Sequence, residues 1–215
     1  MGTAAGKFTI SATIGGANVY QAFERTNDHP NCYVGVPLPA GKAVTDWVKA
    51  VADDEATCNL PGSHGYTDGN FDVYWIDGNG VYQVRYSVPG TIATNALTLD
   101  GGAGAVFPAS ATTGIVVTKQ VPVTVVCDGD KVTAACFEVQ FAASSETAYS
   151  SVVFSDAGPA VVKALHLPAN EANPWWLNSI HANPLTGNPI TSCVASCGSA
   201  TNAGVLNILI LEDAT

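Results

Sequence analysis

Cysteine and histidine side chains recur in this 215-residue chain at spacings that could bind a metal ion. His29 lies three positions before Cys32, and Cys58 lies six positions before His64. Two nitrogens and two sulfurs in a tetrahedron are suitable ligands for a structural zinc ion. Because these spacings differ from those of a compact zinc knuckle, three interpretations stay open: a zinc site, a Cys32–Cys58 disulfide, or four residues without a link.

A second group of possible metal ligands consists of carboxylate and amide side chains. Asp68, Asn70 and Asp72 match the first three ligand positions of a calcium-binding loop. Such a loop also needs glycine at its sixth position and glutamate at its twelfth, where this chain has valine and asparagine. The segment therefore predicts a turn that leads into a strand, and a looser calcium site that includes Asp77 is the open alternative.

Two further cysteines, Cys193 and Cys197, lie four positions apart in a segment rich in serine, alanine and glycine. A loop of this composition could turn back and join them as a disulfide, although the spacing is not that of a C-x-x-C redox motif. The even number of cysteines, six, also suits an oxidising compartment. We nevertheless expect buried free thiols, because the N-terminal residues lack the basic and apolar regions of a signal peptide.

No pattern in the sequence identifies a catalytic centre. The chain has no G-x-S-x-G nucleophile elbow, and Ser63 and His64 are adjacent, so their side chains seldom face one another. The segment 101–104 is rich in glycine but lacks the Lys-Ser/Thr pair that completes a phosphate-binding loop. We therefore expect no enzymatic activity and no cofactor.

The most unusual dipeptide is Trp175-Trp176. Adjacent side chains on an extended segment point in opposite directions, so one indole can enter the core while the other faces a partner. Tryptophan anchors protein interfaces and also stacks on sugars. Three interpretations stay open for this pair: packing beneath a loop, a contact between subunits, or a carbohydrate-binding site.

The composition limits the class of protein. Eight basic residues against 18 acidic ones give an acidic chain with a net charge of −10, yet only 12% of the residues are charged and 47% are hydrophobic. This combination excludes intrinsic disorder. Nucleic-acid binding through a basic patch is excluded as well, because lysine and arginine make the phosphate contacts. The longest C-terminal apolar run, 205–211, is too short to span a membrane as a helix.

Alternation of apolar and polar residues predicts that most of the regular structure is β-strand. The run that begins at Phe8 alternates up to Ile14, as in a strand with one buried face. Two hairpins are predicted, one with its turn at 77–80 and one with its turn at Asp128-Gly129. Pro122, inside an arm of the second hairpin, is expected at a sheet edge or a bulge. Further strands are expected at 151–154, 160–167 and 205–211, and long ordered loops at 15–42, 56–70, 87–114 and 168–204.

One segment shows a helical period instead. Val44, Trp47, Val48 and Val51 would form one apolar stripe on a helix, which predicts a short helix over about 43–52. We expect it to cover an open edge or end of the sheet. The predicted fold is therefore a single all-β domain over residues 1–215, an antiparallel sandwich or jelly-roll-like domain with one short helix and long ordered loops.

The segment 104–118, GAVFPASATTGIVVT, followed by the Asp128-Gly129 turn, resembles bacteriophage virion proteins of the decoration, coat and tail classes. The resemblance is one of texture over about half of the chain, so it assigns no site residue. It implies a non-enzymatic subunit that assembles with copies of itself and with other particle proteins. Such a subunit would be made in the cytoplasm without a signal peptide and would reside in a virion or a released particle. The alternative is a β-sandwich binding module that uses exposed aromatic side chains, with carbohydrate as its ligand.

Overall fold

The computed structural model describes residues 7–14, 17–24, 32–50, 54–103, 106–128, 134–141, 150–156, 161–167, 190–201 and 203–211. All regular secondary structure in these ranges is β-strand, and every strand pair is antiparallel. The all-β antiparallel fold is therefore confirmed. Within the same ranges, no helix is long and apolar enough to cross a membrane.

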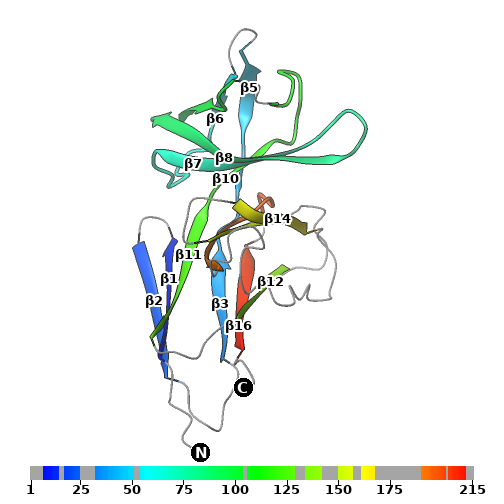
Figure 1. Ribbon diagram of the computed structural model, residues 1–215. Helices are drawn as coiled ribbons and strands as arrows, with labels where there is room; N and C mark the ends of the chain where they lie inside the picture. The colour runs from blue at the N-terminus through cyan, green and yellow to red at the C-terminus, as the bar shows by residue number, and fades with distance from the viewer. Residues whose placement is uncertain are drawn as a thin grey trace, which may run out of the picture.

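The largest sheet has seven strands in the order β4-β10-β7-β8-β9-β6-β5 and forms the upper part of the molecule in Figure 1. It is built almost entirely from one continuous part of the chain. Its strands are β4 (Lys42–Ala43), β5 (Thr45–Lys49), β6 (Glu55–Asn59), β7 (Gly69–Ile76), β8 (Tyr82–Ala93), β9 (Ala96–Asp100) and β10 (Val116–Lys119).

Two further sheets lie below it in Figure 1. The six-stranded sheet has the order β14-β13-β15-β11-β1-β2, and the three-stranded sheet has the order β12-β16-β3. The strands of the six-stranded sheet are β1 (Lys7–Ile14), β2 (Ala17–Glu24), β11 (Val121–Asp128), β13 (Ser150–Asp156), β14 (Val161–Leu167) and β15 (Ile190–Cys197). Those of the three-stranded sheet are β3 (Cys32–Leu38), β12 (Ala134–Phe141) and β16 (Gly204–Leu211).

The described core lies against one face of the seven-stranded sheet. Its fully buried side chains include Phe71, Val73, Leu97 and Leu99, each with no exposed surface. Removing such side chains from water stabilises the fold by roughly 1.5–3 kcal/mol each. Alternation along β7 explains why this sheet forms, because positions 71, 73 and 75 enter the core while 70, 72 and 74 face the junction with the other sheets.

The predicted hairpin at 77–80 is confirmed. Ile76 pairs with Tyr82, so β7 and β8 are joined by this turn. The carboxylate of Asp77 accepts hydrogen bonds from the backbone N–H groups of Asn79 and Val81, each at 2.9 Å. These bonds lower the pKa of Asp77. An aspartate whose side chain accepts hydrogen bonds from the backbone N–H groups of the residues that follow it initiates a tight turn.

The predicted helix over 43–52 is wrong for the residues described, which form β4 and β5. Trp47 is buried at 5% exposure while Val48 is 54% exposed, so the side chains alternate with a period of two. Asp46 has a positive φ of 53°, and the register with β6 shifts between Thr45 and Val48. The bulge disturbs the strict alternation of apolar and polar residues, so the apolar residues fall at a spacing that resembles that of a helix. The segment is nevertheless a strand, because it pairs with β6.

The predicted hairpin at Asp128-Gly129 is also wrong. β11 pairs with β1 and β15, whereas β12 pairs with β16 in another sheet. The apolar strand β16 lies in the middle of its sheet, between β12 and β3, as expected for a strand that is apolar on both faces. Pro122 pairs with Val194 on one side, and the pairing with β1 reaches only to Val123. Pro122 therefore lies at a local sheet edge, as predicted.

Candidate functional site

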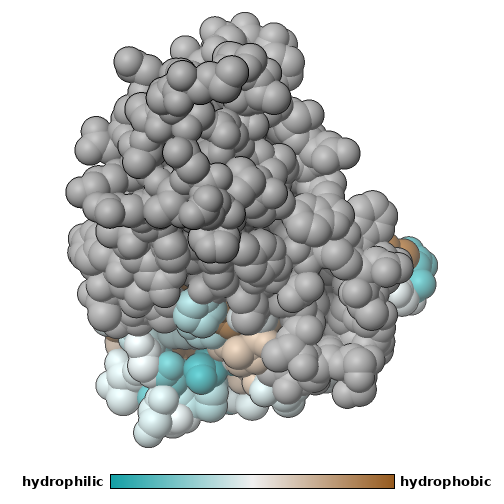
Figure 2. All heavy atoms as spheres, turned by 90° about the horizontal axis from the view of Figure 1, so that it is seen from below, coloured by the Kyte–Doolittle hydropathy of each residue, from teal (hydrophilic) through white to brown (hydrophobic). Residues whose placement is uncertain are grey.

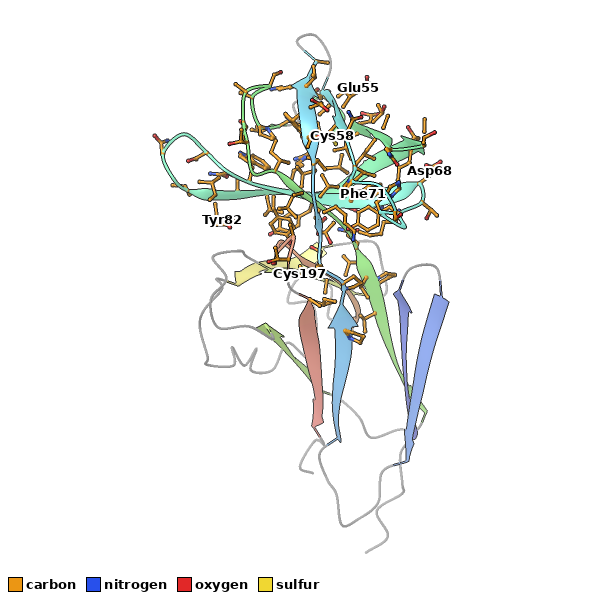
Figure 3. The ribbon with its side chains drawn as sticks, turned by 180° about the vertical axis from the view of Figure 1, so that it is seen from behind. Glu55, Cys58, Asp68, Phe71, Tyr82 and Cys197 are labelled. Carbon is orange, nitrogen blue, oxygen red and sulfur yellow. The ribbon has the colours of Figure 1, made fainter. Side chains whose placement is uncertain are left out.

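Of the four residues considered as zinc ligands, the structure describes Cys32, Cys58 and His64, and it does not bring these three together. Cys58 lies on β6 with 3% of its surface exposed and points into the interior of the upper sheet (Figure 3). Its thiol is free in the structure. Cys32 begins β3 in the three-stranded sheet, and His29 lies outside the described residues.

Both ring nitrogens of His64 already have backbone partners. The N–H of Tyr66 donates to Nδ1 at 3.0 Å, and Nε2 lies 3.1 Å from the carbonyl oxygen of Thr94. With these two hydrogen bonds the imidazole holds the loop against the β8–β9 turn. Among the residues that the structure describes, no group of three or more His, Cys, Asp or Glu is placed to hold a metal ion.

The predicted calcium ligands also point to separate partners. Asp68 accepts the backbone N–H of Ile92 at 2.7 Å and lies at the periphery of the sheet (Figure 3). Asp72 is buried at 2% exposure, whereas Asn70 is exposed. Asp77 lies at the far end of the same strand, in the hairpin turn. The segment leads into β7, and among the described residues these side chains are not brought together as a group of metal ligands.

Cys193 and Cys197 lie on one strand, β15, where a loop is predicted. Four residues of extended strand span roughly 13 Å. A disulfide needs Cα atoms within about 7 Å. On one extended strand the two Cα atoms are therefore too far apart for the disulfide that the sequence left open. Trp175 and Trp176 lie outside the described residues, so their three interpretations stay predictions.

The buried Cys58 thiol makes a testable prediction. Burial raises its pKa to about 12, and because only the thiolate is nucleophilic, we expect Cys58 to resist alkylation in the folded protein. A short pulse of iodoacetamide followed by peptide mass analysis measures this directly. Unfolding in guanidinium chloride is the matched control and must make the same peptide reactive. Full labelling of Cys58 in the folded state would contradict the buried position.

A pocket of about 540 Å³ lies where the seven-stranded sheet meets the six-stranded sheet. Segments far apart in the chain build it: the turn before β4 and the start of β4, the loop before β7 and the start of β7, the passage from β10 to β11, and one residue of β15. The lining residues are Pro39, Ala40, Lys42, His64, Gly65, Tyr66, Thr67, Asn70, Thr118, Lys119, Gln120, Val121, Pro122 and Val194. Neither aspartate nor glutamate occurs among these described lining residues, although the chain has a net charge of −10.

Lys119 is the most constrained cation of this pocket. Its Nζ donates to the carbonyl oxygens of Thr67 and Asp68 at 2.8 and 2.7 Å, and it lies 4.3 Å from the centre of the Phe71 ring. Desolvation lowers the pKa of this ammonium group. Burial likewise raises the pKa of the neighbouring Tyr66 phenol to about 12, so that side chain stays neutral.

A buried hydrogen-bond network lies at the same junction. Oδ1 of Asp72 accepts from the backbone N–H of Ser87 at 2.8 Å and from the side-chain amide of Gln120 at 2.7 Å. The Ser196 hydroxyl donates a hydrogen bond to Oδ2 of Asp72. The same hydroxyl lies 2.6 Å from the Tyr74 hydroxyl. Because Ser196 belongs to β15 and Asp72 to β7, the network joins two sheets.

Desolvation raises the pKa of Asp72, and the hydrogen bonds from Ser196, Ser87 and Gln120 oppose this shift. A proton on Oδ2 is compatible with the geometry, since a protonated carboxyl can donate to Ser196 while Oδ1 keeps both amide donors. In the sequence this residue belongs to the segment for which a calcium site was the open alternative. Its position between Phe71 and Val73, inside an apolar strand, is the feature of the sequence that argues against a calcium ligand.

Exposed apolar side chains are a further feature that could contact another molecule. Ile76 and Val81, beside the β7–β8 turn, are 45% and 52% exposed. The hairpin extends to the right in Figure 1, and in Figure 2 apolar and polar atoms project beyond the rest of the molecule on that side. The aromatic residues of the same two strands are less exposed: Tyr74 and Trp75 are buried, and Tyr82 is half-buried.

No family model matches this chain, and neither the curated proteins nor the solved structures contain a significant match.

Proposed function

We propose that this protein is a non-enzymatic structural subunit that assembles with copies of itself into a larger particle, such as a virion shell, a tail or a filament. The observation that carries the proposal is the edge strand β2. Within the described ranges it pairs only with β1, and it contributes the edge of the six-stranded sheet over eight residues. An edge strand of this kind offers backbone N–H and C=O groups to another chain.

The composition of β2 favours such pairing. Its sequence, ANVYQAFE, has no proline, and its one charged residue, Glu24, is the last. Edge strands that avoid association usually contain lysine, proline or a bulge. β2 has none of these, and Ala17–Glu24 pairs with β1 without a shift in register.

The edge strand β5 of the seven-stranded sheet shows the opposite design. It contains Asp46 and Lys49 within five residues, and it is bulged. The Ser110 hydroxyl accepts the backbone N–H of Lys49 at 3.0 Å, so a side chain already occupies this edge. The same chain thus protects one sheet edge and leaves β2 suited to pairing, which supports a specific role for β2 in assembly.

The two edges of the six-stranded sheet allow two kinds of assembly. Pairing of β2 with β2 of a second copy gives a two-fold dimer, because the same surface is used on both subunits. Pairing of β2 with β14 of a second copy continues from one subunit to the next and gives rings or filaments. We favour the second arrangement for a particle subunit, and the mass distinguishes the two.

The test is the native mass and shape at micromolar concentration, from light scattering and negative-stain microscopy. We expect a defined species well above the monomer mass of 22.0 kDa, and rings or filaments in the micrographs. Higher salt should strengthen association, because each copy carries a net charge of −10. A strict monomer at all salt concentrations would overturn the proposal.

A pair of charge variants locates the contact. Asn18 and Ala22 pair in register with Thr13 and Thr9, the polar positions of β1. The variant Asn18→Lys/Ala22→Lys should dissociate the particle, since lysine on an edge strand opposes pairing. Thr45→Lys on the protected edge strand β5 is the matched control and should leave the mass unchanged. Intact particles in both variants would exclude β2 as the contact.

A further inference from the structure

The pocket between the seven-stranded and six-stranded sheets has a chemistry that the proposed assembly does not use. We propose that it binds a small anionic ligand, a carboxylate attached to a compact apolar body. The pocket volume of about 540 Å³ lies within the range of sites for small molecules, which is roughly 300–1,000 Å³.

The position of two lysines supports an anionic group on the ligand. Lys42 of β4 pairs in register with Val117 of β10, and Lys119 lies two residues further along β10. Residues in this diagonal relation share one face of the sheet, with roughly 7–8 Å between them. Both lysines line the pocket, so two long cationic side chains can reach one carboxylate.

The contacts of Lys119 fix the place where that carboxylate would bind. Two of its N–H groups are used by the carbonyl oxygens of Thr67 and Asp68, and an ammonium group has three. The Phe71 ring below it and the two carbonyls hold the side chain in one position. A carboxylate that accepts the third N–H would therefore meet an ammonium group whose conformational entropy is already largely lost.

The walls of the pocket match an apolar body. Pro39, Ala40, Val121, Pro122 and Val194 supply aliphatic surface, and the Tyr66 ring adds an aromatic surface. The absence of aspartate and glutamate from the described lining residues means that these residues do not repel an anion. Apolar walls with a few convergent polar groups are the usual composition of a small-molecule site.

The experiment compares 2-naphthoate with its neutral counterpart 2-naphthamide, using calorimetric titration of the 215-residue protein. We expect 2-naphthoate to bind at least tenfold more tightly than the amide. Lys42→Met should remove this preference, because the variant keeps an apolar stem and loses the charge. Lys49→Met, a lysine on β5 that does not line the pocket, is the matched control and should bind like the unmodified protein.

A second variant decides the result if Lys42→Met does not fold. Ala40→Trp places a large side chain in the pocket and should reduce binding of both compounds at least tenfold. The proposal is overturned if neither compound binds the unmodified protein, if both bind equally, or if folded Lys42→Met keeps the preference for the carboxylate. These outcomes do not depend on particle mass, so the pocket and the assembly contact are tested separately.

Discussion

Replacement of Asp72 by alanine should lower the free energy of unfolding by about 3 kcal/mol, because the change removes the buried acceptor of three hydrogen bonds. The affected donors are the backbone N–H of Ser87, the amide of Gln120 and the hydroxyl of Ser196. Asp72 is only 2% exposed, so water cannot easily replace the carboxylate. Urea denaturation of the two proteins at pH 7 measures the difference.

Asp72→Asn is the matched control, since an asparagine has the same shape and keeps most of the network. Its side-chain oxygen can accept from Ser87 and Gln120, and its amide N–H can donate to Ser196. We expect this variant to be at least as stable as the unmodified protein at pH 7, because it removes the cost of a buried charge. Equal destabilisation by alanine and asparagine would contradict this account of the network.

The raised pKa of Asp72 also predicts a pH dependence with a definite sign. The folded state holds a proton on this carboxyl at pH values where the unfolded state has released it. Stability from this group is therefore greatest below the ordinary value of 3.8 and falls as the pH rises toward the raised folded-state pKa. Asp72→Asn should remove this fall. If the free energy of unfolding falls by the same amount in both proteins over this pH range, other carboxyl groups cause the fall.

The fold class was predictable from the sequence because alternation is a local property. The β7–β8 hairpin could be found from its apolar positions and from Asp77, whose carboxylate binds the backbone of the turn. The segment 43–52 was misassigned because a bulge at Asp46 shifts the strand pattern, and bulges depend on the partner strand. The Asp128-Gly129 turn was a strong local signal, but β12 instead pairs with the distant apolar strand β16.

Most of the missed strands lie in segments predicted to be loops. β2 and β3 fall within 15–42, where Gln21 and Gly35 interrupt the apolar pattern, and both are stabilised by pairing with strands elsewhere in the chain. The candidate pocket was beyond sequence reasoning for the same reason. Its lysines, Lys42 and Lys119, are 77 positions apart and become neighbours only through the pairing of β4 with β10.

Phe71→Ala should have the largest effect on stability, a loss of about 3–5 kcal/mol, which is typical of a fully buried phenylalanine. The ring has no exposed surface, lies 5.8 Å from the Tyr66 ring and supports the ammonium group of Lys119. Phe71→Leu, which keeps much of the volume, should cost only about 1 kcal/mol. Urea denaturation measures both, and a similar loss in the two variants would contradict a volume effect.

Gly90 offers a sharper test of how Phe71 is packed. A Cβ atom at this position would lie 2.8 Å from two carbons of the Phe71 ring, so the ring packs directly against the glycine backbone. Gly90→Ala alone should therefore be destabilising, because the ring must move. In the Phe71→Ala background the new methyl group no longer meets the ring, and its remaining close neighbour is the end of the Leu97 side chain, at 3.0 Å. The double variant should consequently be more stable than the sum of the two single changes predicts, by about 1 kcal/mol or more, as expected for residues in direct contact. Strict additivity would mean that the ring does not pack against β8.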